Sequence, residues 1–176
     1  MNGEAEASPG EGQLTIQVLE PHLLEGLRQS VKDILETMVF TSPQSVDAVA
    51  EDCSEFSAPV IGTLGFTGTR KGSFVVRTDE IVTRTLAAKM LMMEVSDLGS
   101  FQEVADAFGE VVNMVAGNFK NAWVAGGNQM NLATPNVIQG GTARVGSDTD
   151  GSLRTCIRVQ LEQGNLDIGL HFESKC

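Results

Sequence analysis

The hydrophobic positions of residues 100–123 recur at the spacing of an amphipathic helix, the longest that the chain predicts. Ser100 followed by Glu103 has the spacing of a capping box, so the helix is expected to begin at this point. The glycine pair at 126–127 is expected to end it. One side of the helix carries the apolar side chains that would face a core: Val104, Phe108, Val111, Val115, Phe119 and Ala122.

Two further helices are predicted upstream of this one. The first starts at Pro21, a residue suited to the first turn of a helix, and ends before Ser42 and Pro43. Its expected buried side is formed by Leu23, Leu27, Val31, Ile34, Leu35 and Met38. The second is shorter and is capped by Asp79. Its expected buried side is formed by Ile81, Val82, Leu86, Ala87, Met90 and Leu91.

Alternating apolar and polar residues predict two β-hairpins, formed by residues 59–78 and 153–172. A short strand is also expected at 13–19, and another at 130–139, where Pro135 indicates an edge strand or a bulge. Residues 44–58 and 140–151 are interpreted as a connection and a glycine-rich loop. The order of these elements predicts an α/β (α+β) fold, in which two long helices pack on one side of a mainly antiparallel sheet.

The length of 176 residues is suited to one domain, which we assign to residues 13–176. Residues 1–12 are acidic, with three glycines and a proline, and are expected to form a disordered tail. They do not resemble a basic, apolar secretion signal, and no apolar run approaches the roughly 20 residues that cross a bilayer. These features predict a cytoplasmic protein that is not inserted in a membrane.

The charge and the reactive residues exclude several classes of function. A net charge of −11 disfavours binding to nucleic acid or to anionic membranes, because both are negatively charged. The three cysteines are scattered without metal-ligand spacing, so no metal site is expected. His22 and His171 belong to no nucleophile motif, and the chain has no phosphate-binding loop. An unrelated small-molecule enzyme therefore has little support.

The polar side of the predicted long helix is unusual in its choice of residues. Asp106, Glu110, Asn113 and Gly117 fall on one exposed line. Gly109 and Gly117 each cost about 1 kcal/mol relative to alanine in a helix, and asparagine is also a poor helix former. The line is either a solvated face with tolerated glycines or a docking ridge, on which small residues let a partner's backbone approach a carboxylate and a carboxamide.

The spacing Asp106-x-x-x-Glu110-x-x-Asn113, followed by a loop and then by Pro135, resembles the CheX/CheC/FliY chemotaxis phosphatase family, and single-site CheX-like proteins in particular. The resemblance extends over roughly residues 20 to 173. It implies dephosphorylation of the aspartyl phosphate of a CheY-type response regulator. Asn113 would orient water and Glu110 would anchor the partner's lysine. The chain itself would bind no cofactor, because the Mg²⁺ belongs to the regulator.

The resemblance also implies roles for the other residues of this motif. Gly117 and Gly109 would keep the ridge low where the partner approaches. Asp106 would either contact the partner or extend the solvated face. Pro135 would shape the strand behind the helix without touching phosphate. The competing hypothesis is a non-enzymatic domain that binds a regulator or assembles as flagellar switch proteins do.

The family that this chain resembles is built on a pseudo-twofold, which predicts two similar halves. The resemblance also implies that two chains can join their sheets edge to edge as a homodimer. A local similarity between the two helix sequences aligns Glu36 in the first helix with Glu110 in the long one. Val39 then stands in the place of Asn113, so one site is expected rather than two.

Overall fold

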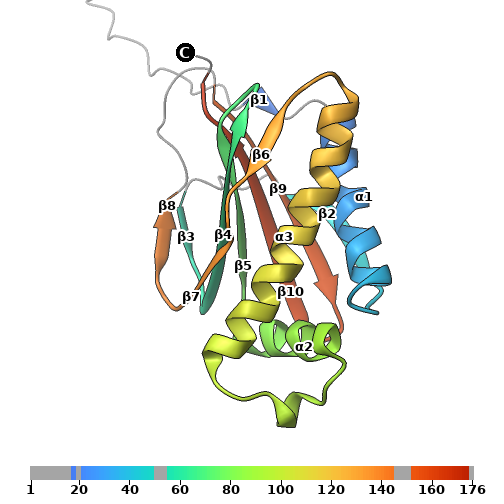
Figure 1. The fold of residues 1–176 in the computed structure, drawn as a ribbon, viewed down its shortest axis with the longest axis vertical. Helices are drawn as coiled ribbons and strands as arrows, with labels where there is room; N and C mark the ends of the chain where they lie inside the picture. Colours follow the sequence, from blue (N-terminus) through green and yellow to red (C-terminus); the bar gives the residue numbers. More distant parts are fainter. Residues whose placement is uncertain (1–16, 19–20, 50–54, 145–151, 175–176) are drawn as a thin grey trace, which may run out of the picture.

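A computed structural model describes residues 17–18, 21–49, 55–144 and 152–174 of the chain. In the described part of the chain, three α-helices lie on one face of a β-sheet, and a short 3-10 helix lies in the connection between the second and the third of them (Figure 1). They are α1 (Pro21–Thr37), α2 (Glu80–Leu91), η1 (Val95–Asp97) and α3 (Phe101–Ala125). Predictions for residues 1–16, 19, 50–54 and 145–151 lie outside the described residues.

The sheet has eight strands, which are antiparallel to their neighbours except where β1 pairs with β9. The main path is β1 (Gln17–Val18), β9 (Leu153–Leu161), β10 (Gly164–Phe172), β5 (Gly72–Thr78), β4 (Val60–Gly68) and β6 (Met130–Leu132). In addition β2 (Ser45–Val49) pairs with β9, and β7 (Asn136–Gln139) pairs with β4. A separate two-stranded ribbon consists of β3 (Glu55–Ser57) and β8 (Thr142–Arg144). The predicted α+β architecture and both predicted hairpins are confirmed.

The core lies between the helices and the sheet. Phe119 of α3 packs edge to face on Phe74 of β5, with ring centroids 5.6 Å apart. Near the end of the same helix, Trp123 stacks on Phe172 of β10 at 5.0 Å. Buried aromatic pairs of this kind add to the stability that burial alone provides. They fix the C-terminal part of α3 against the two central strands.

Strand order confirms the two pseudo-symmetric halves. The first half contributes α1, β2, β4 and β5, and the second contributes α3, β6, β7, β9 and β10. Across the sheet the strands follow the order β2, β9, β10, β5, β4, β7. When each strand is replaced by its counterpart in the other half, the same order results in reverse. The helices correspond as well, since α1 packs beside β2 and α3 beside β6 and β7.

The predicted alignment of Glu36 with Glu110 is wrong. Glu36 lies in the last turn of α1, and Val39 is a buried residue beyond the helix end, whereas Glu110 lies in the first half of α3. Matching the ends of the two helices also matches their buried stripes, Leu23, Leu27, Val31 and Leu35 with Val111, Val115, Phe119 and Trp123. His22 and Glu25 of α1 then stand at the positions of Glu110 and Asn113.

Several local predictions are also corrected. Residues 44–58 contain β2 and β3, and β8 lies within 140–151. The strand at 130–139 is interrupted, with Pro135 between β6 and β7. Met38 lies past the end of α1, and Ile81 and Leu91 are exposed because α2 buries a different stripe, Val82, Thr83, Leu86, Ala87 and Ala88. At the end of α3, Trp123 is buried in place of Ala122.

The start of α3 also differs in detail from the predicted capping box. Ser100 is the N-cap residue, but its side chain makes no capping hydrogen bond. Glu103 Oε2 instead accepts a hydrogen bond of 2.9 Å from the backbone N–H of Gly99, one residue before the cap. Asp79, in contrast, caps α2 as predicted, because its Oδ1 accepts from the N–H of Val82 at 2.8 Å.

A buried carboxylate lies on the sheet face opposite the helices. Asp167 on β10, 7% exposed, accepts hydrogen bonds from Arg77 on β5 at 2.9 Å and from Arg158 on β9 at 2.8 Å. Burial by itself would raise the pKa of the Asp167 carboxyl, but the hydrogen bonds and charges of Arg158 and Arg77 outweigh it and lower that pKa. The charged form therefore stabilises the fold.

We expect Asp167→Asn to lower the free energy of unfolding by about 2 kcal/mol at pH 7, since the variant loses the charge that both arginines face. A lowered pKa contributes stability above the unfolded value of about 3.9, and that contribution is lost as the pH falls toward the folded value. Urea unfolding at pH 7 and pH 3 should therefore show the two proteins converging at the lower pH. An equal difference at both pH values would contradict this role.

Candidate functional site

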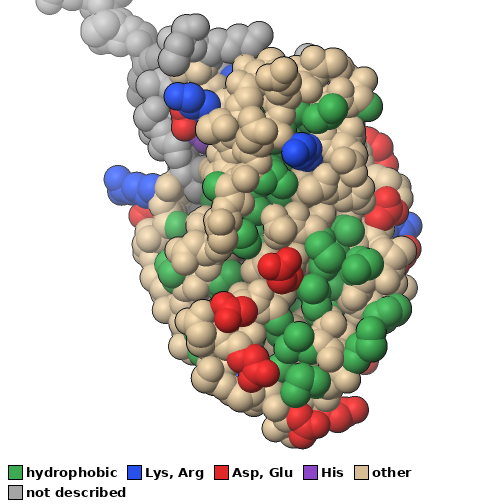
Figure 2. All heavy atoms as spheres, in the orientation of Figure 1, with side chains coloured by type: hydrophobic (Ala, Val, Ile, Leu, Met, Phe, Trp, Pro, Cys, Tyr) green, Lys and Arg blue, Asp and Glu red, His purple; other side chains and the backbone are tan. Residues whose placement is uncertain are grey.

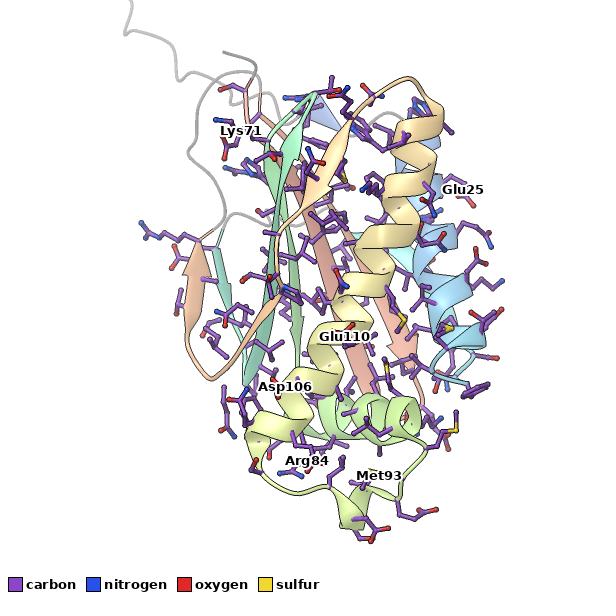
Figure 3. The ribbon with its side chains drawn as sticks, viewed as in Figure 1. Glu25, Lys71, Arg84, Met93, Asp106 and Glu110 are labelled. Carbon is purple, nitrogen blue, oxygen red and sulfur yellow. The ribbon has the colours of Figure 1, made fainter. Side chains whose placement is uncertain are left out.

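The four residues of the predicted line are distributed along the outward face of α3. Asp106 and Glu110 are exposed, whereas Asn113 and Gly117 are half-buried. Figure 3 shows Asp106 and Glu110 on the side of α3 that faces away from the sheet. Glu110 and Asn113 are three residues apart and so are neighbours on the helix surface. The helix thus presents a carboxylate and a carboxamide together.

The side chains of Glu110 and Asn113 form no hydrogen bond or ion pair with any residue that the structure describes. Asp106 differs, because its Oδ1 accepts a hydrogen bond of 2.8 Å from Gln102 one turn earlier. The donors and acceptors of Glu110 and Asn113 are therefore available to an external group, while Asp106 is partly engaged within its own helix.

Gly109 lies on the buried side of α3, so its predicted place on the exposed ridge is wrong. A Cβ at this position would lie 3.6 Å from Pro135 Cγ and 3.7 Å from Val137 Cγ2. Gly109 instead faces the segment that joins β6 to β7, at distances that are ordinary packing contacts for a Cβ. Pro135 thus supports the site from behind, between two short strands that both pair with β4.

Gly117 has open space around it, since a Cβ there would meet no atom within 4 Å. No packing within the described structure therefore accounts for a glycine at this position, and an alanine would stabilise the helix. Gly109 differs because it is buried beside Pro135 and Val137, whereas Gly117 lacks a side-chain contact of this kind in the described structure. A partner that approaches the backbone of α3 would supply one.

The line itself contains no nucleophile, strong base or metal centre. Among the described residues there is no cluster of three or more His, Cys, Asp or Glu side chains that could hold a metal ion. A pocket of about 270 Å³ lies elsewhere, between α1 and β2, with Arg28, Lys32 and Gln44 in its lining. The carboxylate and carboxamide of Glu110 and Asn113 are suited to pairing with a cation and to positioning a water.

The remaining reactive side chains are not part of this line. His171 is buried on β10, and the strand alternation turns it away from the helices. Burial, followed by the nearby charge of Arg154, lowers the pKa of His171, which favours the neutral form. Cys156 is a buried thiol on β9, in a small cluster with Ile61 and Val75.

None of the described helices is long and apolar enough to span a membrane.

Comparison with solved structures places the fold among chemotaxis proteins. The CheX protein of Vibrio vulnificus is 28% identical, with a TM-score of 0.70 over 86% of this chain and 99% of that chain. CheX of Desulfovibrio desulfuricans is 23% identical, with a TM-score of 0.72 over 86% and 99% of the two chains. A CheX–CheY–BeF3–Mg²⁺ complex from Borrelia burgdorferi is 18% identical, with a TM-score of 0.69 over 86% and 98%.

A sequence comparison with curated proteins finds no match. The family model described as chemotaxis phosphatase CheX, in contrast, matches residues 60–159, which is more than half of the chain. That region contains both central hairpin strands of the first half, all of α3 and Pro135. The match and the shared fold together show that this chain belongs to the CheX family of chemotaxis phosphatases.

Proposed function

We propose that this protein hydrolyses the aspartyl phosphate of a CheY-type response regulator, with Asn113 orienting the attacking water and Glu110 pairing with a lysine of the regulator. The observation that carries the proposal is the pairing of Glu110 and Asn113 on the outward face of α3, with both side chains unengaged by the described residues. Membership of the CheX family supports the same substrate class.

An aspartyl phosphate suits this incomplete site because it is already prone to hydrolysis. Water attacks phosphorus, the bond between phosphorus and the aspartyl oxygen breaks, the carboxylate leaves, and inorganic phosphate is released with the proton of the water. A carboxamide oxygen can accept a hydrogen bond from that water and hold the water oxygen in line with phosphorus. Such positioning can lower a barrier by several kcal/mol without a base on this chain.

The regulator would supply the remaining chemistry. Its own Mg²⁺ and lysine would hold the phosphoryl group, so the phosphatase needs no cofactor. The Borrelia complex, which contains CheY, BeF3 and Mg²⁺, provides a precedent for a CheX protein bound to such a partner. We further propose, as the family resemblance implies, that two chains associate through sheet edges. Strands β1 and β2 form the described edge beside β9, and β6 and β7 form the edge beside β4.

The proposal is tested by following phosphate release from purified regulators that carry radiolabelled aspartyl phosphate. The wild-type protein is expected to accelerate the loss of label at substoichiometric concentration. Glu36→Ala provides a matched control, since Glu36 is an exposed glutamate on a different helix, and it should retain full activity. A protein that binds the regulator without accelerating hydrolysis would instead be a non-enzymatic adaptor.

Gly117→Ala tests whether Gly117 is a glycine tolerated on a solvated face or a position at which a partner docks. The substitution should raise the free energy of unfolding by up to about 1 kcal/mol, because alanine is the better helix former and the site is open. If a partner's backbone approaches here, the more stable variant should bind the regulator several-fold more weakly. Thermal unfolding and calorimetric titration with a beryllofluoride-loaded regulator measure both effects. Unchanged affinity would assign Gly117 to a merely solvated face.

A further inference from the structure

Two large apolar side chains occupy backbone conformations that favour glycine. Phe40 (φ 53°) and Met92 (φ 55°) are the non-glycine residues with positive φ in the described part of the chain. Each follows the end of a helix whose last turn is closed by a backbone hydrogen bond, from Thr41 N–H to Leu35 O and from Met93 N–H to Ala88 O. Glycine or asparagine is usual at such positions, because a Cβ disfavours the left-handed conformation.

These same two side chains are also strongly exposed. Phe40 is 63% exposed and Met92 82% exposed. A glycine at either position would remove both the backbone strain and an apolar group from water. Neither the fold nor solubility therefore explains the residues present, and local rules broken in this way are typical of functional surfaces.

The ends of the two helices lie side by side. Lys89 Nζ of α2 donates a hydrogen bond of 2.8 Å to Thr41 Oγ1, which directly follows Phe40. Exposed apolar neighbours extend both ends, and we call the resulting group the apolar patch: Met38, Phe40, Leu91, Met92, Met93 and Val95. Two chain segments far apart in sequence thus build one surface.

The apolar patch lies on the same face of the molecule as the line on α3. Helix α2 packs directly against α3, and Figure 3 shows Met93 and Glu110 on this common face. Figure 2 shows hydrophobic surface extending from beside the acidic side chains of α3 toward the lower right of the molecule, over α2 and the end of α1. A protein domain that covers Glu110 and Asn113 can therefore reach the apolar patch.

We propose that the apolar patch is a second contact for the same response regulator, a protein with an apolar surface and a basic rim near its phosphorylation site. This inference rests on the proposed function. The line on α3 is narrow and polar, and a single carboxylate that pairs with a lysine supplies only part of the affinity of a specific complex. An aromatic side chain and adaptable methionines are the residue types that anchor protein interfaces.

Charge favours a regulator over a second copy of this chain. Glu94 and Asp97 are exposed within the same segment as Met92 and Val95, and the chain carries a net charge of −11. Association of two copies through this surface would bring like charges together, which opposes binding. A regulator with lysine or arginine around its apolar surface meets complementary charge.

The test uses the double variants Phe40→Gly/Met92→Gly and Phe40→Asn/Met92→Asn in the full chain. Both pairs suit the left-handed backbone, so they should unfold at the wild-type temperature or above. Their Kd for a beryllofluoride-loaded regulator should rise at least tenfold, while phosphate release at saturating regulator stays within twofold of wild type, because Glu110 and Asn113 are unchanged. Val124→Ala, which truncates an exposed apolar side chain at the other end of α3, is the control and should alter neither quantity.

Three outcomes would overturn the inference, and they are distinguishable. If the double variants bind the regulator within twofold of wild type while all proteins remain active, the apolar patch is not a regulator contact and the proposed function stands. If wild type is dimeric by sedimentation and only the double variants are monomeric, with unchanged affinity, a second copy covers the patch. If wild type neither binds nor dephosphorylates any regulator, both proposals fail together.

Discussion

Asn113→Ala is expected to slow hydrolysis of bound, phosphorylated regulator by roughly a hundredfold, which corresponds to about 2.7 kcal/mol of transition-state stabilisation. The carboxamide would act only on the attacking water, so its loss should reduce kcat without weakening the complex. Stability should change by no more than about 0.5 kcal/mol, since the side chain is half-buried on the outer face and makes no hydrogen bond with the described residues.

Single-turnover phosphate release with saturating enzyme measures the rate of this step directly. Asn118→Ala is the matched control, because Asn118 is a half-buried asparagine on the same helix but off the line. It should retain nearly full activity. If Asn113→Ala accelerates hydrolysis as much as wild type does, the water-orienting role is wrong. If wild type itself does not accelerate hydrolysis, the adaptor hypothesis is the better account.

Glu110→Ala is expected to weaken binding about tenfold, or 1.4 kcal/mol, and to lower the rate of hydrolysis as well. The carboxylate would pair with a lysine that also contacts the phosphoryl group, so its loss affects both the complex and the geometry of the reaction. Unlike Asn113→Ala, this variant should change Kd and kcat together. The two substitutions therefore separate anchoring from water positioning on adjacent turns of one helix.

The salt dependence of binding tests whether the charge of Glu110 is the cause of the lost affinity. Wild-type affinity should fall as ionic strength rises, because an exposed ion pair is screened, and the affinity of Glu110→Ala should depend less on salt. Glu110→Gln preserves shape and removes only charge, so it should behave like the alanine variant. Glutamine with full affinity would show that Glu110 contributes a hydrogen bond or packing and not an ion pair.

The long helix and its outward line could be predicted from the sequence because both follow from one local period. The stripe from Val104 to Phe119 defines the buried side, and the positions of Glu110 and Asn113 opposite it follow directly. The two hairpins were equally accessible, since each is closed by a short turn and stabilised by neighbouring residues in the chain.

What sequence reasoning missed depends on contacts between distant segments. Strand β2 is short and half-exposed, and it exists through pairing with β9, more than 100 residues later. Gly109 falls near the polar side of the helix by periodicity, yet Pro135 from another segment covers it. The left-handed backbone conformations of Phe40 and Met92, which follow the ends of α1 and α2, could not be predicted from local rules. Phenylalanine and methionine rarely adopt positive φ, so their residue types argue against the conformation that they have.

The interleaved strand order has a consequence for how the protein folds. Each half supplies an outer strand that pairs only with the other half, β2 with β9 and β7 with β4, and the halves meet again where β5 pairs with β10. Neither half has a complete sheet of its own, so the first half cannot reach a stable state while the second is still being synthesised. Contacts of such long sequence separation slow folding. The domain should acquire its structure late, in one cooperative step, after β9 and β10 have left the ribosome.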